Sequence, residues 1–416
     1  MARYLLLPLV LLVSLCLAGP LSAQSDEFGK WISLFNGKDT TGWVNAKPDE
    51  GNHKGPNRWT VEDGALTNGN DGQNDVCTEA EFENYELELE YRVPVREKRD
   101  GNSGVYLRGW VEVQVFDSHG REKPQAHDAG AIYGGFVPLK NTSKPAGEWN
   151  RYRIVHLGKR VTVYHNDALV QDNVLVPSNT PGSMTLRPGT KEKLDGIRGP
   201  IMFQGDHTKV WYRNIRIRPM LTAADGWRPL WNGRDLSEFT ARGDKRAAGG
   251  LVWKIEDGAF TNAESGGKGH DIWTNEAFGN FLVHYDYRSD PKVEGGNSGF
   301  YLRDQWEIQI LRETTKDPHS DGSLYSIKAP DAVVRNGPTE WNQMDVKVDG
   351  MKIWVWQNGK LLHDGATLKT RTDNHGVKTE AWSKGPFKLQ GDHGKVWFAN
   401  LFIKPLPDTG EQRASL

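Results

Sequence analysis

The stretch "GNSGVYLRGWVEVQVFD", Gly101–Asp117, decides the fold, because apolar and polar side chains alternate along it in two runs. In the first run Val105 and Leu107 alternate with Tyr106 and Arg108, and in the second run three valines alternate with more polar neighbours. A period of two is typical of a β-strand that turns one face to the core. The stretch therefore predicts two adjacent strands whose polar side chains all leave the core on the same side.

The same phrase occurs a second time in the chain, as "GNSGFYLRDQWEIQILR" over residues 296–312. Other segments recur in the same order: "LFNGKD" returns as "LWNGRD", "WTVEDGALTN" as "WKIEDGAFTN", and "QGDHTKVW" as "QGDHGKVW". A repeat of this length indicates a duplicated domain and not a short-period solenoid. The junction lies near "MLTAADGW", so we expect domains over residues 28–220 and 226–406.

The sequence of each copy predicts many short strands. The segments "KRVTVYHNDALV" and "KIWVWQNGKLL" both place a turn dipeptide between two alternating runs, which is the pattern of a β-hairpin. Neither copy shows a long helical periodicity. Many short strands separated by Gly, Pro and Asn predict an all-β protein built as two antiparallel β-sandwiches of the jelly-roll kind.

The N-terminus predicts export. Arg3 precedes an apolar run over residues 5–17, and "GPLSAQ" follows with small residues near Ala23. This order is typical of a signal peptide, here residues 1–23, and implies a periplasmic or extracellular protein. Cys77 is then the one remaining cysteine, so no intrachain disulfide is expected, and no later segment predicts a membrane span.

The net charge and the composition restrict the classes of molecule that the protein is expected to bind. The formal net charge of −2 at pH 7 argues against nucleic acid or an anionic membrane surface as a partner. The 16 tryptophans suit either a large β core or platforms for sugar rings. We therefore expect a carbohydrate substrate or ligand, while the oligomeric state stays open.

One strand face has the chemistry of a sugar site. An aromatic ring, a guanidinium, a carboxylate and an amide are expected on it, from Tyr106, Arg108, Glu112 and Gln114. The ring can stack on a sugar, and the planar polar groups can bond its hydroxyls. The alternative is a surface strand pair with a chance salt bridge between Arg108 and Glu112. Glu90 is a further candidate, although a solvated strand face explains it equally well.

The segment "QGDHTKVW" adds a histidine, His207, in a tight turn between two strands. Both copies keep Gln-Gly-Asp-His, which favours a functional role, whereas the alternative is a turn stabilised by Asp206. Gln204 and Asn102 complete the candidate binding residues. The sequence contains no zinc-type ligand spacing, no Gly-x-Ser-x-Gly elbow and no phosphate loop, so we expect no catalytic metal or cofactor and leave a structural calcium open.

Taken together and in order, these motifs resemble the 3-keto-disaccharide hydrolase domain family. The resemblance rests on "LFNGKD", "WTVEDGAL", "GNSGVYLRG", "EVQVFD", "GAIYG", "KPAGEWN" and "QGDH", and it covers both copies. It implies an exported bacterial protein with two concanavalin A-like jelly rolls. It also implies a glycoside hydrolase or lyase that acts on sugars oxidised to a ketone at carbon 3.

Such a substrate needs no pair of glycosidase carboxylates. The ketone acidifies the proton on carbon 2, a base removes it, the enolate expels the group on carbon 1, and water then adds. We expect Glu112 or His207 as the base, Arg108 near the developing oxyanion, and Tyr106 with Gln114 as positioning groups. Asp117 is a candidate to orient His207 or assist the leaving group, although strict alternation turns it away from Glu112.

Two other function classes remain open, a non-catalytic lectin-like protein and a β-sandwich scaffold. The second copy retains an equivalent set of candidate residues: Asn297, Tyr301, Arg303, Glu307, Gln309 and His393. It carries Arg312 where the first copy has Asp117, and a cation beside the site would lower the basicity of a carboxylate or histidine. We therefore expect catalysis in the first domain, unless both residues lie beyond the strand end and touch nothing.

Overall fold

The computed structural model describes residues 28–98, 100–176, 179–242, 251–262, 269–290, 292–312, 314–337, 339–368 and 384–407. The predicted signal peptide lies outside these residues. The regular structure is almost entirely β, with short 3-10 helices at Gly51–His53, Ala223–Asp225 and Glu294–Gly296. No helix in the described part of the chain is long and apolar enough to cross a membrane.

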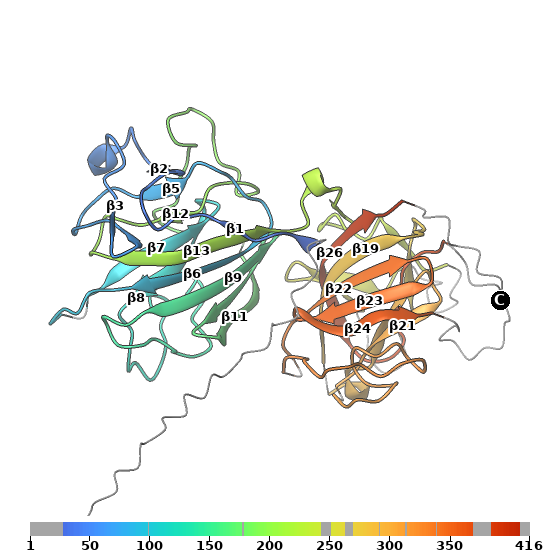
Figure 1. Cartoon of the computed structure of the whole chain (residues 1–416). Helices are drawn as coiled ribbons and strands as arrows, with labels where there is room; N and C mark the ends of the chain where they lie inside the picture. The colour runs from blue at the N-terminus through green and yellow to red at the C-terminus, as the bar shows by residue number, and fades with distance from the viewer. Residues whose placement is uncertain are drawn as a thin grey trace, which may run out of the picture.

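The first domain is a sandwich of two antiparallel sheets (Figure 1). Its larger sheet has the order β11-β10-β9-β6-β13-β4-β3, with β1 paired to β13, and its smaller sheet has the order β2-β5-β12-β7-β8. The strands are β1 Ile32–Ser33, β2 Trp43–Asn45, β3 Thr60–Glu62, β4 Ala65–Thr67, β5 Val76–Thr78, β6 Tyr85–Arg92, β7 Asn102–Leu107, β8 Val111–Phe116, β9 Asn150–Leu157, β10 Arg160–His165, β11 Ala168–Leu175, β12 Met202–Phe203 and β13 Trp211–Pro219.

The second domain repeats this arrangement, as the duplicated sequence predicts. Its sheets have the orders β16-β17-β26-β19-β22-β23-β24, with β14 paired to β26, and β15-β18-β25-β20-β21. The strands are β14 Arg228–Pro229, β15 Phe239–Thr240, β16 Trp253–Glu256, β17 Ala259–Asn262, β18 Ile272–Thr274, β19 Phe281–Ser289, β20 Ser298–Leu302, β21 Trp306–Ile310, β22 Asn342–Asp349, β23 Lys352–Gln357, β24 Lys360–Thr367, β25 Lys388–Leu389 and β26 Val396–Pro405. The all-β fold class and the two jelly-roll-like bodies are thus confirmed.

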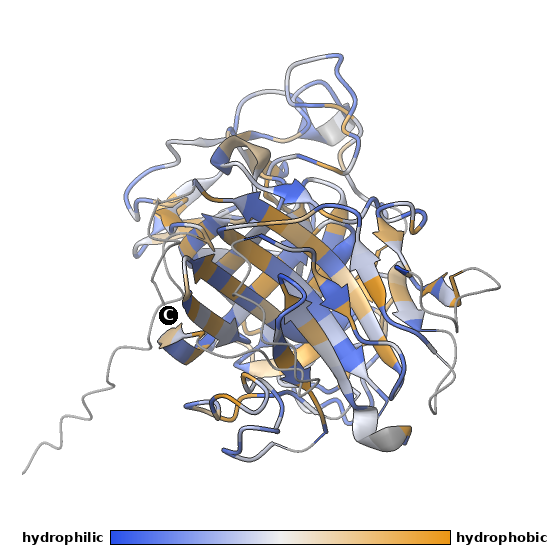
Figure 2. Ribbon diagram, turned by 90° about the vertical axis from the view of Figure 1, so that its right-hand side faces the viewer, coloured by the Kyte–Doolittle hydropathy of each residue, from blue (hydrophilic) through white to orange (hydrophobic). Residues whose placement is uncertain are grey.

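Each core forms because alternate side chains of the two sheets meet between them. Figure 2 shows the alternation as bands of hydrophobic and hydrophilic colour along the strands. Closely stacked rings join the two layers, Phe203 with Tyr212 at 4.0 Å between centroids in the first domain and Tyr285 with Phe300 at 4.1 Å in the second. These contacts hold each domain together through its core, without a disulfide among the described residues.

The predicted register of β8 is correct, but its polar face is not open. Val113 and Val115 lie in the core, and Glu112 and Gln114 point to the opposite face. Glu112 and Gln114 are nevertheless only 2% exposed each. Loops cover this face: the Glu112 amide donates to Thr180 Oγ1, and the segment after β8 hydrogen-bonds along the edge of that strand.

The polar face of β6 is likewise less solvated than the sequence predicts for a strand face that carries Glu90. Glu86 and Glu88 are 6% and 9% exposed. Glu86 bonds Arg153 and Arg218, and Glu88 bonds arginines on the same two neighbouring strands. The outer face of the large sheet is therefore an ion-pair lattice, because β9 and β13 bring cations to both sides of β6.

The two domains lie side by side and share an apolar seam (Figure 1). Phe28, from the segment before β1, packs between Trp227 and Trp356 of the second domain, with ring centroids 5.6 and 5.5 Å away. Val155 and Leu282 are buried in the same cluster. The seam therefore ties the start of the first domain to the large sheet of the second.

We predict that Phe28→Ala weakens this seam. A buried Phe→Ala change typically costs about 3–5 kcal/mol, because it leaves a cavity between rings that cannot close around it. The free energy of unfolding from urea titrations should fall by about this amount, whereas Val95→Ala, at a site 77% exposed, should leave it unchanged. Equal stability of the two variants would contradict a structural role for the seam.

Candidate active site

The candidate site is built on the paired strands β7 and β8, where Tyr106 lies directly opposite Glu112. Tyr106 Oη donates to Glu112 Oε2 at 2.9 Å and lies 2.9 Å from the Pro181 carbonyl oxygen. Gly104 makes room for the carboxyl group, because a Cβ atom there would stand 2.3 Å from Glu112 Oε1. Gly104, the second glycine of "GNSGVYLR", therefore leaves the space that the carboxyl group occupies.

Burial changes the acidity of this pair. It raises the pKa of Glu112 to about 8, and the hydrogen bond from Tyr106, followed by the charge of His207, offsets only part of that rise. Burial, followed by the nearby Glu112 charge, also raises the pKa of the Tyr106 phenol. A carboxylate whose pKa lies near the working pH is a stronger base than an ordinary glutamate.

A histidine–aspartate pair lies at the more open part of the same region. His207 Nδ1 is 2.6 Å from Asp206 Oδ1, and the two side chains are 42% and 39% exposed. The hydrogen bond to Asp206 raises the pKa of His207, with the Glu112 charge acting in the same direction. His207 is therefore suited to carry and donate a proton near neutral pH.

Asp206 also lies close to His53 and Asp75, and one ligand atom of each of these three residues lies within 4.8 Å of the others. One imidazole nitrogen and two carboxylates could hold a divalent cation. Lys47 Nζ, however, is 2.9 Å from Asp75 Oδ2, so a cation and this ammonium would compete for the same carboxylate.

Other predicted residues also reach this face. Gln114 Nε2 lies 3.4 Å from Asn102 Oδ1. The backbone amide of Gln204 donates to the backbone carbonyl of Gly104. Gln114 Oε1 is buried and has no hydrogen-bond partner among the described residues. A buried acceptor without a partner is costly, so this oxygen is suited to receive a ligand hydroxyl.

Three predicted residues lie elsewhere. Arg108 has a positive φ of 56° at the end of β7, and its guanidinium donates to the carbonyls of Gly158 and Gly196. The strand alternation ends there, so Arg108 does not share the face of Glu112. Asp117 is buried just past β8 on the valine side, and Glu90 pairs with Arg213 on the outer face of the other sheet.

Several groups of this region were not among the residues predicted from the sequence. Tyr133 lies beside Glu112, because its amide donates to the Glu112 carbonyl, and its ring packs 5.1 Å from that of His127. Asp75 was missed too, although "NDVCT" and "HDIWT" align and both copies keep this aspartate. A comparison of the two copies could have identified Asp75, whereas no sequence pattern indicated that Lys47 or His53 belongs to the site.

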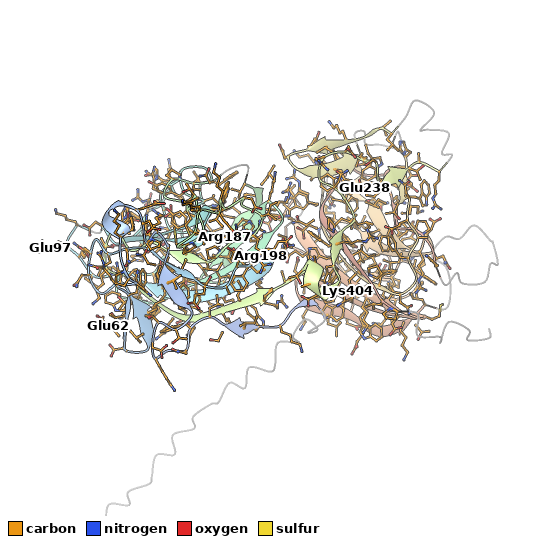
Figure 3. The ribbon with its side chains drawn as sticks, turned by 90° about the horizontal axis from the view of Figure 1, so that it is seen from above. Glu62, Glu97, Arg187, Arg198, Glu238 and Lys404 are labelled. Carbon is orange, nitrogen blue, oxygen red and sulfur yellow. The ribbon has the colours of Figure 1, made fainter. Side chains whose placement is uncertain are left out.

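A long loop over residues 179–200 covers the face. Thr180 and Pro181 bond Glu112 and Tyr106, and Arg187 Nε holds the loop to Glu81 at 2.7 Å. Figure 3 looks down on this loop and labels Arg187 and Arg198, which lie over the first domain in that view. The loop therefore contributes to the burial of Glu112, which is 2% exposed.

The second domain repeats the central geometry. Gly299 would place a Cβ atom 2.0 Å from Glu307 Oε1, and His393 Nδ1 is 2.6 Å from Asp392 Oδ1. Gln309 Nε2 donates to Asn297 Oδ1 at 3.0 Å. The other retained arginine, Arg303, bonds the Gly350 and Gly279 carbonyls in the manner of Arg108.

A lysine distinguishes the second site. Lys388 stands where the first domain has Met202, with Nζ 3.5 Å from the Tyr301 ring centroid and 3.5 Å from Asp271 Oδ2. Burial raises the pKa of Glu307 to about 7, and the Lys388 charge works against that rise. The expected cation is thus present, but it is Lys388, whereas Arg312 is exposed beyond the end of β21.

Comparison with known proteins points to one family. Residues 30–218 and 226–404 both match the model of the 3-keto-alpha-glucoside-1,2-lyase-like domain. A relative from Bacteroides thetaiotaomicron, named 3-keto-disaccharide hydrolase, is 25% identical over 233 residues, 45% of this chain and 78% of the relative.

Two crystal structures of candidate glycosyl hydrolases from Parabacteroides distasonis are also similar. They are 29% and 28% identical, with TM-scores of 0.35 and 0.34. Each covers 46% of this chain, and the matches cover 84% and 100% of those two proteins.

We predict that Glu112→Gln stabilises the first domain increasingly as pH rises. Between the ordinary pKa of 4.5 and about 8 the unfolded chain releases the Glu112 proton and the folded chain retains it. The wild type therefore loses about 1.4 kcal/mol of stability per pH unit in this window through this one group. The gap between variant and wild type should be near zero at low pH, widen across the window and level off above it.

Urea unfolding followed by tryptophan fluorescence at a series of pH values measures this gap. Glu192→Gln is the matched control for the Glu→Gln change itself, since its side chain is 73% exposed. A Glu112→Gln gap that does not change with pH would show that this carboxyl group titrates normally.

Proposed function

Because the chain belongs to the family of 3-keto-alpha-glucoside-1,2-lyase-like domains, we propose that its first domain cleaves 3-keto-glycosides by elimination and water addition. The observation that carries the proposal is that two hydrogen-bonded acid–base pairs, Tyr106–Glu112 and His207–Asp206, belong to neighbouring strands: the turn with His207 follows β12, and β12 pairs with β7 at Tyr106. The charge of His207 lowers the pKa of Glu112, and the charge of Glu112 raises the pKa of His207, as is expected of groups that lie close together.

In the proposed first step ionised Glu112 takes the proton from carbon 2 of the keto sugar. The electron pair moves into an enolate and then expels the oxygen on carbon 1, to which protonated His207 donates its proton. The bond between carbon 1 and the leaving oxygen breaks, and an enone remains. In the second step water adds to carbon 1, His207 takes a proton from the water, and Glu112 returns its proton to carbon 2.

The raised pKa values suit this division of roles. Glu112 is a stronger base than a solvated glutamate, and the bond from Asp206 keeps His207 protonated to higher pH. Arg108 no longer serves as the oxyanion stabiliser, because its guanidinium is held by Gly158 and Gly196. We assign that role to Lys47, a cation that pairs with Asp75 beside the histidine–aspartate pair.

A second function fits the second domain better, namely carbohydrate binding without turnover. Lys388 lies over the buried ring of Tyr301, the partner of Glu307, and so places a cation beside the counterpart of the proposed base. The Lys388 charge also works against the rise in the pKa of Glu307, and a carboxylate with a lower pKa is a weaker base. The proposed division of labour thus rests on Lys388. The leader expected from the sequence would place both activities outside the cytoplasm.

We predict that Gly104→Ala removes activity and that Gly299→Ala retains it. Both added methyl groups would collide with a carboxyl oxygen, at 2.3 Å in the first domain and 2.0 Å in the second. Displacing the base by about 1 Å can cost 10²-fold in rate, so the first variant should lose about that factor in kcat. The assay follows leaving-group release from a nitrophenyl 3-keto-glucoside by the whole chain, with the unoxidised glucoside as a blank.

The two outcomes separate the domains. Equal loss in both variants would mean that both domains turn over, and loss in Gly299→Ala alone would assign catalysis to the second domain. Cleavage of the unoxidised glucoside at a similar rate would contradict the elimination route itself.

We further predict that His207→Ala slows leaving-group release about 10²–10⁴-fold, the usual contribution of a general acid. His393→Ala is its matched partner in the second domain and should retain the wild-type rate. The loss should be smallest for substrates whose leaving group is acidic, since a good leaving group needs no proton. A loss independent of leaving-group acidity would exclude the proton-donor role.

A further inference from the structure

A second pocket opens in the first domain at the turn between β7 and β8. Its volume of about 310 Å³ falls within the range of about 300–1,000 Å³ that is usual for small-molecule sites. Segments far apart in the chain supply most of its lining: residues 83–84, the β7–β8 turn, the β9–β10 turn and residues 195–197 of the long loop. The side chains of the candidate active site do not line this pocket, so the two sites are separate.

Arg108 forms one wall of the pocket, and its partners in the described chain are neutral oxygens. Its Nη1 donates to the Gly158 and Gly196 carbonyls at 2.8 and 2.9 Å, and its Nη2 lies 3.4 Å from Asn84 Oδ1. Its Nε is buried and has no hydrogen-bond partner among the described residues. A buried donor without a partner is costly, so this guanidinium favours a ligand that brings an oxygen acceptor.

His156 forms a second polar wall. It is 3% exposed, and Tyr85 Oη lies 3.4 Å from its Nδ1, at the long end of a hydrogen bond. Burial, followed by the charge of Arg108, lowers the pKa of His156 well below its usual value, so the imidazole is neutral at physiological pH. A neutral imidazole offers one donor and one acceptor nitrogen. Because a hydroxyl group also donates and accepts, His156 is matched to a ligand hydroxyl and not to an ion.

The charges around the pocket balance one another. Arg108 and Lys159 are cations, and Glu83 and Asp195 are carboxylates. Burial lowers the pKa of Arg108, and the nearby charges of Glu83 and Asp195 oppose that shift. A free anion would be attracted by the cations and repelled by the carboxylates. Neutral hydroxyl groups can bond both kinds of group, so the balance favours an uncharged ligand with several hydroxyls.

Trp110 adds an aromatic wall. It is half-buried, and a Cβ atom at Gly196 would lie 2.9 Å from its Cε2, so the glycine lets the long loop pack close to the ring. Val111, Val176 and Ile197 make the rest of the lining apolar. Apolar and aromatic walls with a few polar groups are typical of ligand sites, and an aromatic ring suits the apolar face of a sugar.

The second domain shows which of these features the fold itself needs. Its Arg303 donates to two backbone carbonyls in the manner of Arg108, so the arginine has a structural role in both copies. Trp306 takes the place of Val111 in the strand pairing, is 1% exposed, and has its ring centroid 5.7 Å from the guanidinium of Arg303. A buried indole therefore lies beside the arginine where the first domain has a valine and a pocket.

The other polar lining groups are also particular to the first domain. The strand pairings and the repeated motifs place these replacements in the second domain: Phe281 for Tyr85, Val348 for His156, Met351 for Lys159 and Gln305 for Trp110. An arginine that only joins loops needs neither the histidine nor the lysine, since Arg303 joins its loops without them. A ligand explains these groups better than the fold does.

We propose that this pocket is a second carbohydrate site, which binds one neutral hexose ring without cleaving it. Arg108 and Lys159 donate to sugar oxygens, His156 bonds a hydroxyl group, and Trp110 contacts the apolar face of the ring. The proposal does not depend on the elimination chemistry, because no group of that mechanism lines the pocket. The site would hold carbohydrate next to the same loop that covers the candidate active site.

Fluorine NMR of the whole chain labelled with fluorotryptophan tests the proposal. The Trp110 resonance is the one that is absent from Trp110→Gln, a change to the residue that the second domain carries. Titration with methyl glucoside, methyl galactoside and methyl mannoside should shift this resonance saturably for at least one of the three sugars. The Trp31 resonance is the internal control, since this ring is 37% exposed and does not line the pocket.

Variants that import residues of the second domain locate the binding. His156→Val and Lys159→Met should each weaken the affinity about 2- to 10-fold, the usual effect of losing one hydrogen bond. Lys159 is exposed, so its variant should fold and remain informative even if His156→Val loses stability. Lys191→Met is the matched control, because this exposed lysine of the same loop does not line the pocket, and it should leave the affinity unchanged.

A Trp110 resonance that none of the three sugars shifts would overturn the proposal. So would an affinity that neither His156→Val nor Lys159→Met lowers. A shift caused by glucuronate alone would show an anion site and overturn the assignment to a neutral sugar.

Gly104→Ala separates this proposal from the proposed catalysis. The Trp110 shift should persist in that variant, whose turnover is expected to fall, because Gly104 does not line the pocket. A shift that Gly104→Ala abolishes and Lys159→Met retains would assign the sugar to the candidate active site, and would overturn the second site.

Discussion

The five-stranded sheet of each domain has to bury both of its faces, and the candidate site follows from that constraint. One face meets the larger sheet through Val105, Val113 and Phe203, as in any sandwich. The other face lies under the loop of residues 179–200, yet it carries a carboxyl group, a phenol and amides. Burying such groups is costly unless they bond one another, and Tyr106 and Glu112 do so.

That burial changes ordinary residues into acid–base groups. In solution the Glu112 carboxyl group would be ionised at neutral pH and a weak base, but without water around it the protonated form is favoured up to a pH of about 8. Gly104 is part of the same device, since it is the absence of a side chain that lets the carboxyl group lie flat on the strand. Burying the Glu112 carboxyl group lowers the stability of the folded domain at neutral pH, as is common at functional sites. The hydrophobic cores of the sandwiches offset that loss.

The second domain shows how little change is needed to alter such a site. It retains the glycine, the tyrosine–glutamate pair and the histidine–aspartate pair, and it replaces one buried methionine by Lys388. The lysine contacts the ring of Tyr301 and the carboxylate of Asp271, whereas in the first domain Met202 packs with Tyr106 and Lys47 pairs with Asp75.

The sequence by itself determined the fold class, the duplication and the strand register, because these depend on local alternation and on repeated motifs. It also brought Glu112, Tyr106, Gln114 and His207 together as candidates, since two strands and one turn carry them. Tertiary structure decided the rest. Arg108 turns away because its backbone takes a left-handed conformation at the strand end, and its guanidinium finds carbonyls in two distant loops. The burial of Glu112, the approach of Lys47 and the charge of Lys388 depend on loops and strands far apart in the chain. Such contacts leave no periodic trace in a sequence, because they are set by how the layers pack and not by the spacing of neighbours.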